Sequence, residues 1–101
     1  MVDEVGMNDR QLVEVSREFR RGLLSCESSE MMCMIVSSAL GGYLSAVFGI
    51  ECEVEEVDFG HTNHVWLKLA DGRILDPTAD QFGLPAVYLG EVPEKYKEWM
   101  G

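Results

Sequence analysis

A charge-free run of 20 residues, from Met31 to Ile50, is the feature that most constrains how this chain can fold. A helix of that length is able to span a bilayer, and it is equally able to form the buried centre of a small globular core. Serines and glycines dilute its hydrophobicity, and its neighbours Glu30 and Glu51 provide no basic cluster that would orient it in a membrane. We therefore expect a central helix that ends near Phe48 and is buried on nearly every side. A membrane-spanning helix is the weaker alternative.

The overall composition favours one globular domain that spans residues 1–101. The hydrophobic share is 47% and the charged share is 26%, which is the usual balance for a folded chain. The net charge of −10 predicts that phosphate backbones and anionic lipids repel most of the surface. We expect no nucleic-acid partner and no membrane partner.

The cysteines stand at positions 26, 33 and 52, an odd number with no CxxC pair. The first residues include Asp3, Glu4 and Asp9 instead of the basic and then apolar run of a signal peptide. These features argue against a disulfide framework and against a structural zinc site. We expect a cytoplasmic protein with free thiols, no bound metal and no cofactor.

The spacing of apolar residues and turn signals predicts an α+β fold. A first helix begins at Asn8, which forms a capping box with Gln11, and it stops near Gly22. A last helix begins at Pro93 and carries its two aromatic residues on one face. Strands are expected at about residues 51–59, 63–69, 73–76 and 86–89. The buried central helix packs on this short antiparallel sheet, with the N-terminal and C-terminal helices beside it.

The apolar residues of the first strand change faces part-way along it. Cys52 and Val54 share one parity, whereas Val57 and Phe59 share the other. A β-bulge near residues 55–56 is therefore expected, because it would turn all four side chains inward. The sheet also has a second apolar face, which the first and last helices or a partner subunit would cover. The members of that face are Leu67, Leu69 and Leu75.

Cys33, His64 and Asp76 are the residues that together predict chemistry. Cys33 lies near the N-terminus of the central helix, where the helix dipole lowers the pKa of a thiol. A nucleophilic thiolate also needs a base within reach and a third group that orients the base. His64 is a candidate base in the second strand, and Asp76 is a candidate for the orienting group.

The turn at residues 70–72 decides whether Asp76 can reach His64. A two-residue loop would pair Leu67 with Asp76, and the carboxylate would point to the wrong face. A three-residue loop with Gly72 left-handed would pair Trp66 with Asp76 instead, which places the carboxylate diagonally across from His64. The sequence Ala-Asp-Gly-Arg suits the three-residue loop, so we expect the two side chains to meet.

The segments around these residues resemble the transglutaminase-like branch of the papain-like cysteine enzymes, which also includes the arylamine N-acetyltransferases. The resemblance covers about residues 28–82. It rests on Cys33 at the start of a long helix, on FGIECEVEEV after that helix, on NHVWLKL around His64 and on ADGRILDPTADQF around Asp76. It implies a minimal papain-like (transglutaminase-like) core whose catalytic residues are Cys33, His64 and Asp76.

The resemblance further implies acyl transfer on a protein or peptide amide, as in a protease, a deamidase or a transglutaminase-like hydrolase. Cys33 would attack the carbonyl, His64 would move the proton and Asp76 would hold the imidazole, while backbone N–H groups at the helix start meet the oxyanion. Met31 stands where family members often carry glycine, and the chain is shorter than most active members. A catalytically inactive interaction module on the same fold therefore stays an alternative. A homodimer, or a partner subunit that completes the site, is a further alternative. An acetyltransferase-like enzyme that uses a thioester donor is disfavoured, because the chain is too short to build the pocket for that donor.

Other interpretations of the polar residues stay open. Cys26, in the loop before the central helix, is a reserve nucleophile. His61 and His64 form an HxxH pair that Asp76 or Cys52 would complete as a metal site. We disfavour that metal site because the two histidines fall on opposite faces of a strand.

Overall fold

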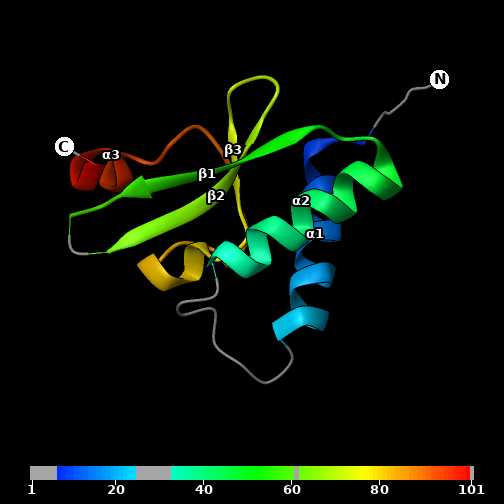
Figure 1. The fold of residues 1–101 in the computed structure, drawn as a ribbon, viewed down its shortest axis with the longest axis horizontal. Coiled ribbons are helices and arrows are strands. Elements are labelled where there is room, and N and C mark those ends of the chain that lie inside the picture. Colours follow the sequence, from blue (N-terminus) through cyan, green and yellow to red (C-terminus); the bar gives the residue numbers. More distant parts are fainter. Residues whose placement is uncertain (1–6, 25–32, 61, 101) are drawn as a thin grey trace.

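A computed structural model describes residues 7–24, 33–60 and 62–100 of the chain. These residues form a small α+β structure in which a four-stranded antiparallel sheet, of order β1-β2-β3-β4, lies among three α-helices (Figure 1). The strands are β1 (Cys52–Asp58), β2 (Asn63–Leu69), β3 (Ile74–Asp76) and β4 (Tyr88–Gly90). The helices are α1 (Asp9–Leu24), α2 (Cys33–Phe48) and α3 (Glu94–Met100), with a 3-10 turn η2 (Ala79–Phe82) between β3 and β4.

Helix α1 begins where the capping box predicts. The Asn8 side chain accepts a hydrogen bond from the Gln11 amide at 2.8 Å, and the Gln11 side chain accepts one from the Asn8 amide at 3.0 Å. Two of the helix's unpaired N–H groups are thereby satisfied. The helix continues past Gly22 to Leu24, so the expected stop at that glycine is wrong.

The two faces of the sheet are covered by different helices. On one face, α1 and α2 pack on an aliphatic cluster that includes Leu67, Leu69 and Leu75. On the other face, α3 packs on an aromatic cluster centred on Trp66 and Tyr96. The expectation that the last helix covers the leucine face is therefore wrong; α2 takes that place together with α1.

Strand β1 pairs with β2 without a break, from Cys52 opposite Leu69 to Asp58 opposite Asn63. The bulge expected near residues 55–56 is therefore wrong. Cys52 faces the aliphatic cluster, whereas Val57 faces the aromatic cluster of α3. Because helices cover both faces of the sheet, Cys52 and Val57 are both partly buried without a bulge, whereas Val54 is exposed at 46%.

The hairpin between β2 and β3 has the three-residue loop that the sequence predicts. Leu67 pairs with Leu75 and Lys68 with Ile74, and the Leu69 amide donates to the Arg73 carbonyl at 2.8 Å. Gly72 turns the chain with a φ of 92°, in the left-handed region that glycine enters most easily. The same register places Trp66 opposite Asp76.

Helix α2 buries only one face, so the prediction of burial on nearly every side is wrong. Leu40 and Leu44 are fully buried against the sheet, whereas Ile35 and Val47 are exposed at 54% and 56%. A single sheet offers one surface to a helix, and α1 covers only a flank of α2, where Phe19 stacks on Tyr43. An uncharged face of α2 is left at the surface. None of the helices in the described segments has the length and hydrophobicity needed to cross a bilayer.

Candidate active site

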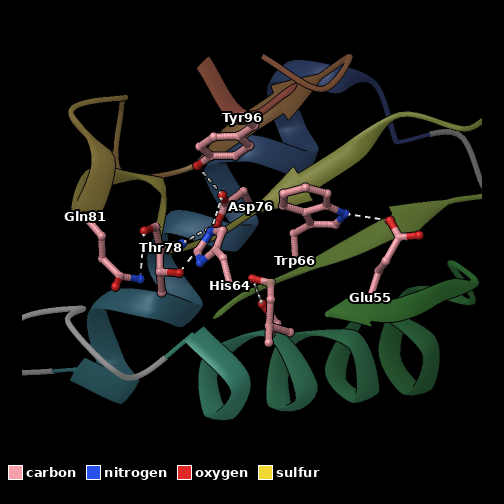
Figure 2. A network of polar contacts seen from close by, with 9 residues as sticks. Glu55, His64, Trp66, Asp76, Thr78, Gln81 and Tyr96 are labelled. Atoms are coloured by element: carbon pink, nitrogen blue, oxygen red, sulfur yellow. Dashed lines mark hydrogen bonds and ion pairs between the residues drawn. The ribbon is translucent and has the colours of Figure 1, made fainter. Parts of the chain in front are cut away.

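His64 and Asp76 meet on the face of the sheet that α3 covers. Both side chains are fully buried, and Nε2 of His64 lies 2.7 Å from Oδ2 of Asp76. His64 stands in β2 and Asp76 ends β3, so the three-residue hairpin loop is what brings them together. Figure 2 shows the Asp76 carboxylate between the imidazole and the ring of Tyr96.

The Asp76 carboxylate accepts hydrogen bonds on both oxygens. Oδ1 accepts a hydrogen bond from the Thr78 amide at 3.0 Å and a second, longer one from the Thr78 hydroxyl at 3.5 Å. Oδ2, the oxygen that holds His64, also accepts a hydrogen bond from the Tyr96 hydroxyl at 2.6 Å. A buried carboxylate is strongly destabilised unless it is paired in this way, so these partners offset the cost of burying Asp76.

Pro77 explains how α2 gains access to this part of the sheet. The register of β2 and β3 would make Val65 and Pro77 the next hydrogen-bonded pair, but proline has no N–H to donate. The Val65 carbonyl instead accepts a hydrogen bond at 3.3 Å from the buried hydroxyl of Ser37, in the second turn of α2. The first turns of α2 therefore dock on the strand edge that β3 leaves free.

Cys33 is the first residue of α2 and lies one helical turn before Ser37, so it faces the same strand edge. Its thiol is partly exposed and contacts the imidazole of His64, and this contact lowers the pKa of the thiol. Partial burial opposes that effect, whereas hydrogen bonding from the backbone of Val65 and Met34 adds to the lowering of the pKa.

The Cys33 pair with His64 is loose in the resting protein. Nδ1 of His64, the nitrogen that Asp76 leaves free, is buried and makes no hydrogen bond of standard geometry within the described residues. The thiol is nonetheless close enough to shift the pKa of both groups. A long contact that tightens when substrate binds is common between a cysteine and its base.

The His64 imidazole is strongly basic in this setting. Burial lowers the pKa of His64, but the hydrogen bond and the charge of Asp76, together with Cys33, outweigh burial and raise the pKa to about 9. A raised pKa of the imidazole beside a lowered pKa of the thiol favours a thiolate–imidazolium pair. That pair gives a nucleophile and a proton donor in one place.

Aromatic rings close the site on the side of α3. The His64 ring lies edge-on to Phe82 at 4.7 Å and to Trp66 at 5.9 Å between centroids. Trp66 is almost fully buried, and its indole N–H donates to Glu55 at 2.7 Å (Figure 2). These rings exclude water from the hydrogen bond between the histidine and the aspartate, which strengthens its electrostatic component.

The remaining sequence candidates do not join the site. Cys52 packs near Gly41 in the aliphatic cluster, where burial raises the pKa of its thiol. The reserve nucleophile Cys26 and the histidine at position 61 lie outside the described residues. Within the described residues, no group of three metal-ligating side chains is assembled.

Sequence reasoning found the three candidate residues but missed the groups that hold the carboxylate. Thr78 belongs to the segment after Asp76, and Tyr96 is one of the two aromatic residues expected on one face of the last helix; the sequence predicts for neither a contact with the carboxylate. A signal for Thr78 was available, because an aspartate followed two residues later by a threonine often forms a local side-chain turn. Tyr96 carried no such local signal, since its contact with Asp76 spans 20 residues of sequence.

The chain matches no protein-family model, no curated protein and no solved structure at a significant level.

Proposed function

We propose that the protein is a cysteine acyl-transfer hydrolase that acts on a protein or peptide amide, with Cys33 as nucleophile, His64 as general acid and base, and Asp76 as the residue that orients the imidazole. The observation that carries the proposal is the Nε2 to Oδ2 distance of 2.7 Å between two fully buried side chains, next to a thiol whose pKa the same imidazole lowers. A buried, charged histidine–aspartate pair is costly to fold, so its presence beside a cysteine favours a functional role.

The proposed reaction has two steps. The Cys33 thiolate attacks the carbonyl carbon, a C–S bond forms, and the C–N bond breaks as His64 gives its proton to the leaving amine. Water or an amine then attacks the thioester, gives a proton to His64 and releases the acyl group, which restores the thiolate. Backbone N–H groups at the start of α2 would stabilise the oxyanion in both steps.

The papain-like, transglutaminase-like fold is part of the same proposal. Support for it comes from the order of the three residues, which are carried by a helix and by two neighbouring antiparallel strands. The helix carries Cys33 at its first described residue, and its Gly41 allows a close approach to Leu67 of the sheet. Both features agree with the family that the sequence segments resemble.

Thiol alkylation tests the proposal without knowledge of the substrate. The full chain is treated with iodoacetamide near pH 6, and labelling of each cysteine is followed by peptide mass spectrometry. Cys33 should react much faster than Cys52, because the pKa of Cys33 is lowered and that of Cys52 is raised. His64→Ala should slow Cys33 by tenfold or more, which corresponds to about one pKa unit, and should leave Cys52 unchanged.

A matched control keeps the result specific to the imidazole. Lys68→Ala removes an exposed side chain from the same strand and the same face, so Cys33 should keep its wild-type rate. Slow alkylation of Cys33 at the rate of a free thiol, unaffected by His64→Ala, would instead favour the alternative, an interaction module without activity. Hydrolysis of peptide amides, compared with incorporation of a primary amine, then distinguishes water from an amine as the acceptor.

A further inference from the structure

Tyr96 shares an oxygen atom with His64. Its hydroxyl donates to Oδ2 of Asp76 at 2.6 Å, and the same oxygen lies 2.7 Å from Nε2 of the imidazole. Thr78 bonds the other oxygen, Oδ1. Within the described residues, the phenol therefore competes directly with the imidazolium for the negative charge of one oxygen.

The Tyr96 ring is held rigidly enough to fix that oxygen. The residue is fully buried, and its ring stacks on Trp66 with centroids 5.4 Å apart and planes 4° apart. Phe59 and Trp99 pack on other sides of it, with centroids 5.1 Å and 6.1 Å away. Burial, followed by the charge of Asp76, raises the pKa of the phenol far above its usual range, so the hydroxyl stays a neutral donor at physiological pH.

We propose that Tyr96 is a positioning residue of the site, which fixes Oδ2 of Asp76 and limits how strongly that oxygen attracts the His64 imidazolium. This inference rests on the proposed function. It also makes helix α3 part of the catalytic apparatus, because α3 contributes the phenol that bonds Oδ2 together with the imidazole of His64. The phenol thereby sets how readily His64 gives up its proton to a leaving group.

The direction of the effect follows from charge. Removal of the hydroxyl leaves more negative charge on Oδ2 for the imidazolium, so the pKa of His64 should rise. The other ionisable groups that act on these residues from described elements are Cys33 on α2, which acts on His64, and Asp80 on η2 and Tyr88 on β4, which act on Tyr96. None of them changes in the variant, so the shift reports the phenol alone.

The test is the titration of His64 in Tyr96→Phe, followed by the nitrogen chemical shifts of the imidazole in the full-length protein. We expect the pKa of His64 to rise by about one unit, a tenfold change in its proton equilibrium. Tyr88→Phe is the matched control, because its hydroxyl donates to the Glu91 carbonyl at 2.6 Å and not to Asp76. Tyr88→Phe should leave the pKa of His64 unchanged.

A second variant preserves the fold if loss of the hydroxyl proves too destabilising. Site-specific 3-fluorotyrosine at position 96 keeps the ring and makes the phenol a stronger donor, so the pKa of His64 should fall. An unchanged pKa in both variants overturns the role of Tyr96, even if thermal stability drops. Wild-type protein in which Cys33 alkylates like a free thiol overturns the proposed function itself, which keeps the two failures separate.

Discussion

Two adjacent serines of α2 show how one residue can anchor the helix. The Ser37 hydroxyl is fully buried and donates to the Val65 carbonyl at 3.3 Å, whereas Ser38 is exposed and its hydroxyl lies 3.7 Å from the sulfur of Met34. A buried carbonyl that loses its donor costs far more than an exposed one. A difference in stability between variants at the two positions would therefore show that α2 is anchored to the sheet through Ser37.

We predict that Ser37→Ala lowers the free energy of unfolding by about 1–2 kcal/mol, because the Val65 carbonyl is left without a partner. Ser38→Ala should be neutral or slightly stabilising, because alanine is the better helix former. Urea denaturation of both variants checks the prediction. Equal effects at the two positions would contradict the hydrogen bond to Val65.

The candidate site could be predicted from sequence because its decisive contact is set by a local signal. The Ala-Asp-Gly loop fixes the register of one hairpin, and the register alone brings Asp76 to the face of His64. Tyr96 could not be placed in the same way, because its position depends on how α3 packs against the sheet. Long-range packing of this kind has no short sequence signature.

At the scale of elements, α2 and β2 approach each other through Gly41. A Cβ at this glycine would lie 3.1 Å from a terminal methyl carbon of Leu67, which is fully buried, and 3.8 Å from the sulfur of Cys52. A Cβ at Gly42 would meet nothing within 4 Å. The two adjacent glycines therefore have different reasons to be in the helix, since only the first allows a close approach.

We predict that Gly42→Ala raises the free energy of unfolding by about 0.5–1 kcal/mol, because alanine loses less backbone entropy in a helix. Gly41→Ala should be destabilising or at best neutral, because the same gain is offset by the crowding of Leu67. Thermal unfolding of the two variants measures the difference, which corresponds to several degrees in Tm for a domain of this size. A greater gain at Gly41 would show that α2 and β2 do not approach as described.

The elements themselves were predicted well wherever a local signal existed. The capping box at Asn8 and the three-residue turn at Gly72 are both present. Three of the errors share one cause: the bulge in β1, the burial all round α2 and the last helix on the leucine face. All three depend on which faces of the sheet are covered and by which helix, and the apolar pattern of one segment does not determine that. The stop at Gly22 is a separate error, because α1 continues to Leu24.

At the scale of the whole molecule, the His64 pair links stability to pH. The pKa of His64 is about 9 in the folded protein, above its unfolded value of 6.5. The stability that this group contributes is therefore fully present below about pH 6.5 and is lost as the pH rises toward 9. The lowered pKa of Cys33 acts in the opposite direction, because its contribution is present at high pH and is lost as the pH falls.

Removal of the thiol separates these two effects. In Cys33→Ala, Asp76 still holds the pKa of His64 above its unfolded value, so we predict that the free energy of unfolding decreases as the pH rises above about 6.5. Each unit of pKa difference contributes about 1.4 kcal/mol. Urea denaturation from pH 6 to pH 9.5 measures the slope. The double variant Cys33→Ala, His64→Phe should lack it, and an equal slope in both would contradict the pairing with Asp76.

Pro77 determines which neighbouring group donates a hydrogen bond to the Val65 carbonyl. An ordinary amino acid at position 77 would offer an N–H to the Val65 carbonyl, and β3 and α2 would then compete for one acceptor. A chain that resolved this competition in favour of the strand would have a longer hairpin and a helix displaced from the imidazole. The reach of the cysteine toward its base thus depends on a proline that takes no part in the proposed chemistry.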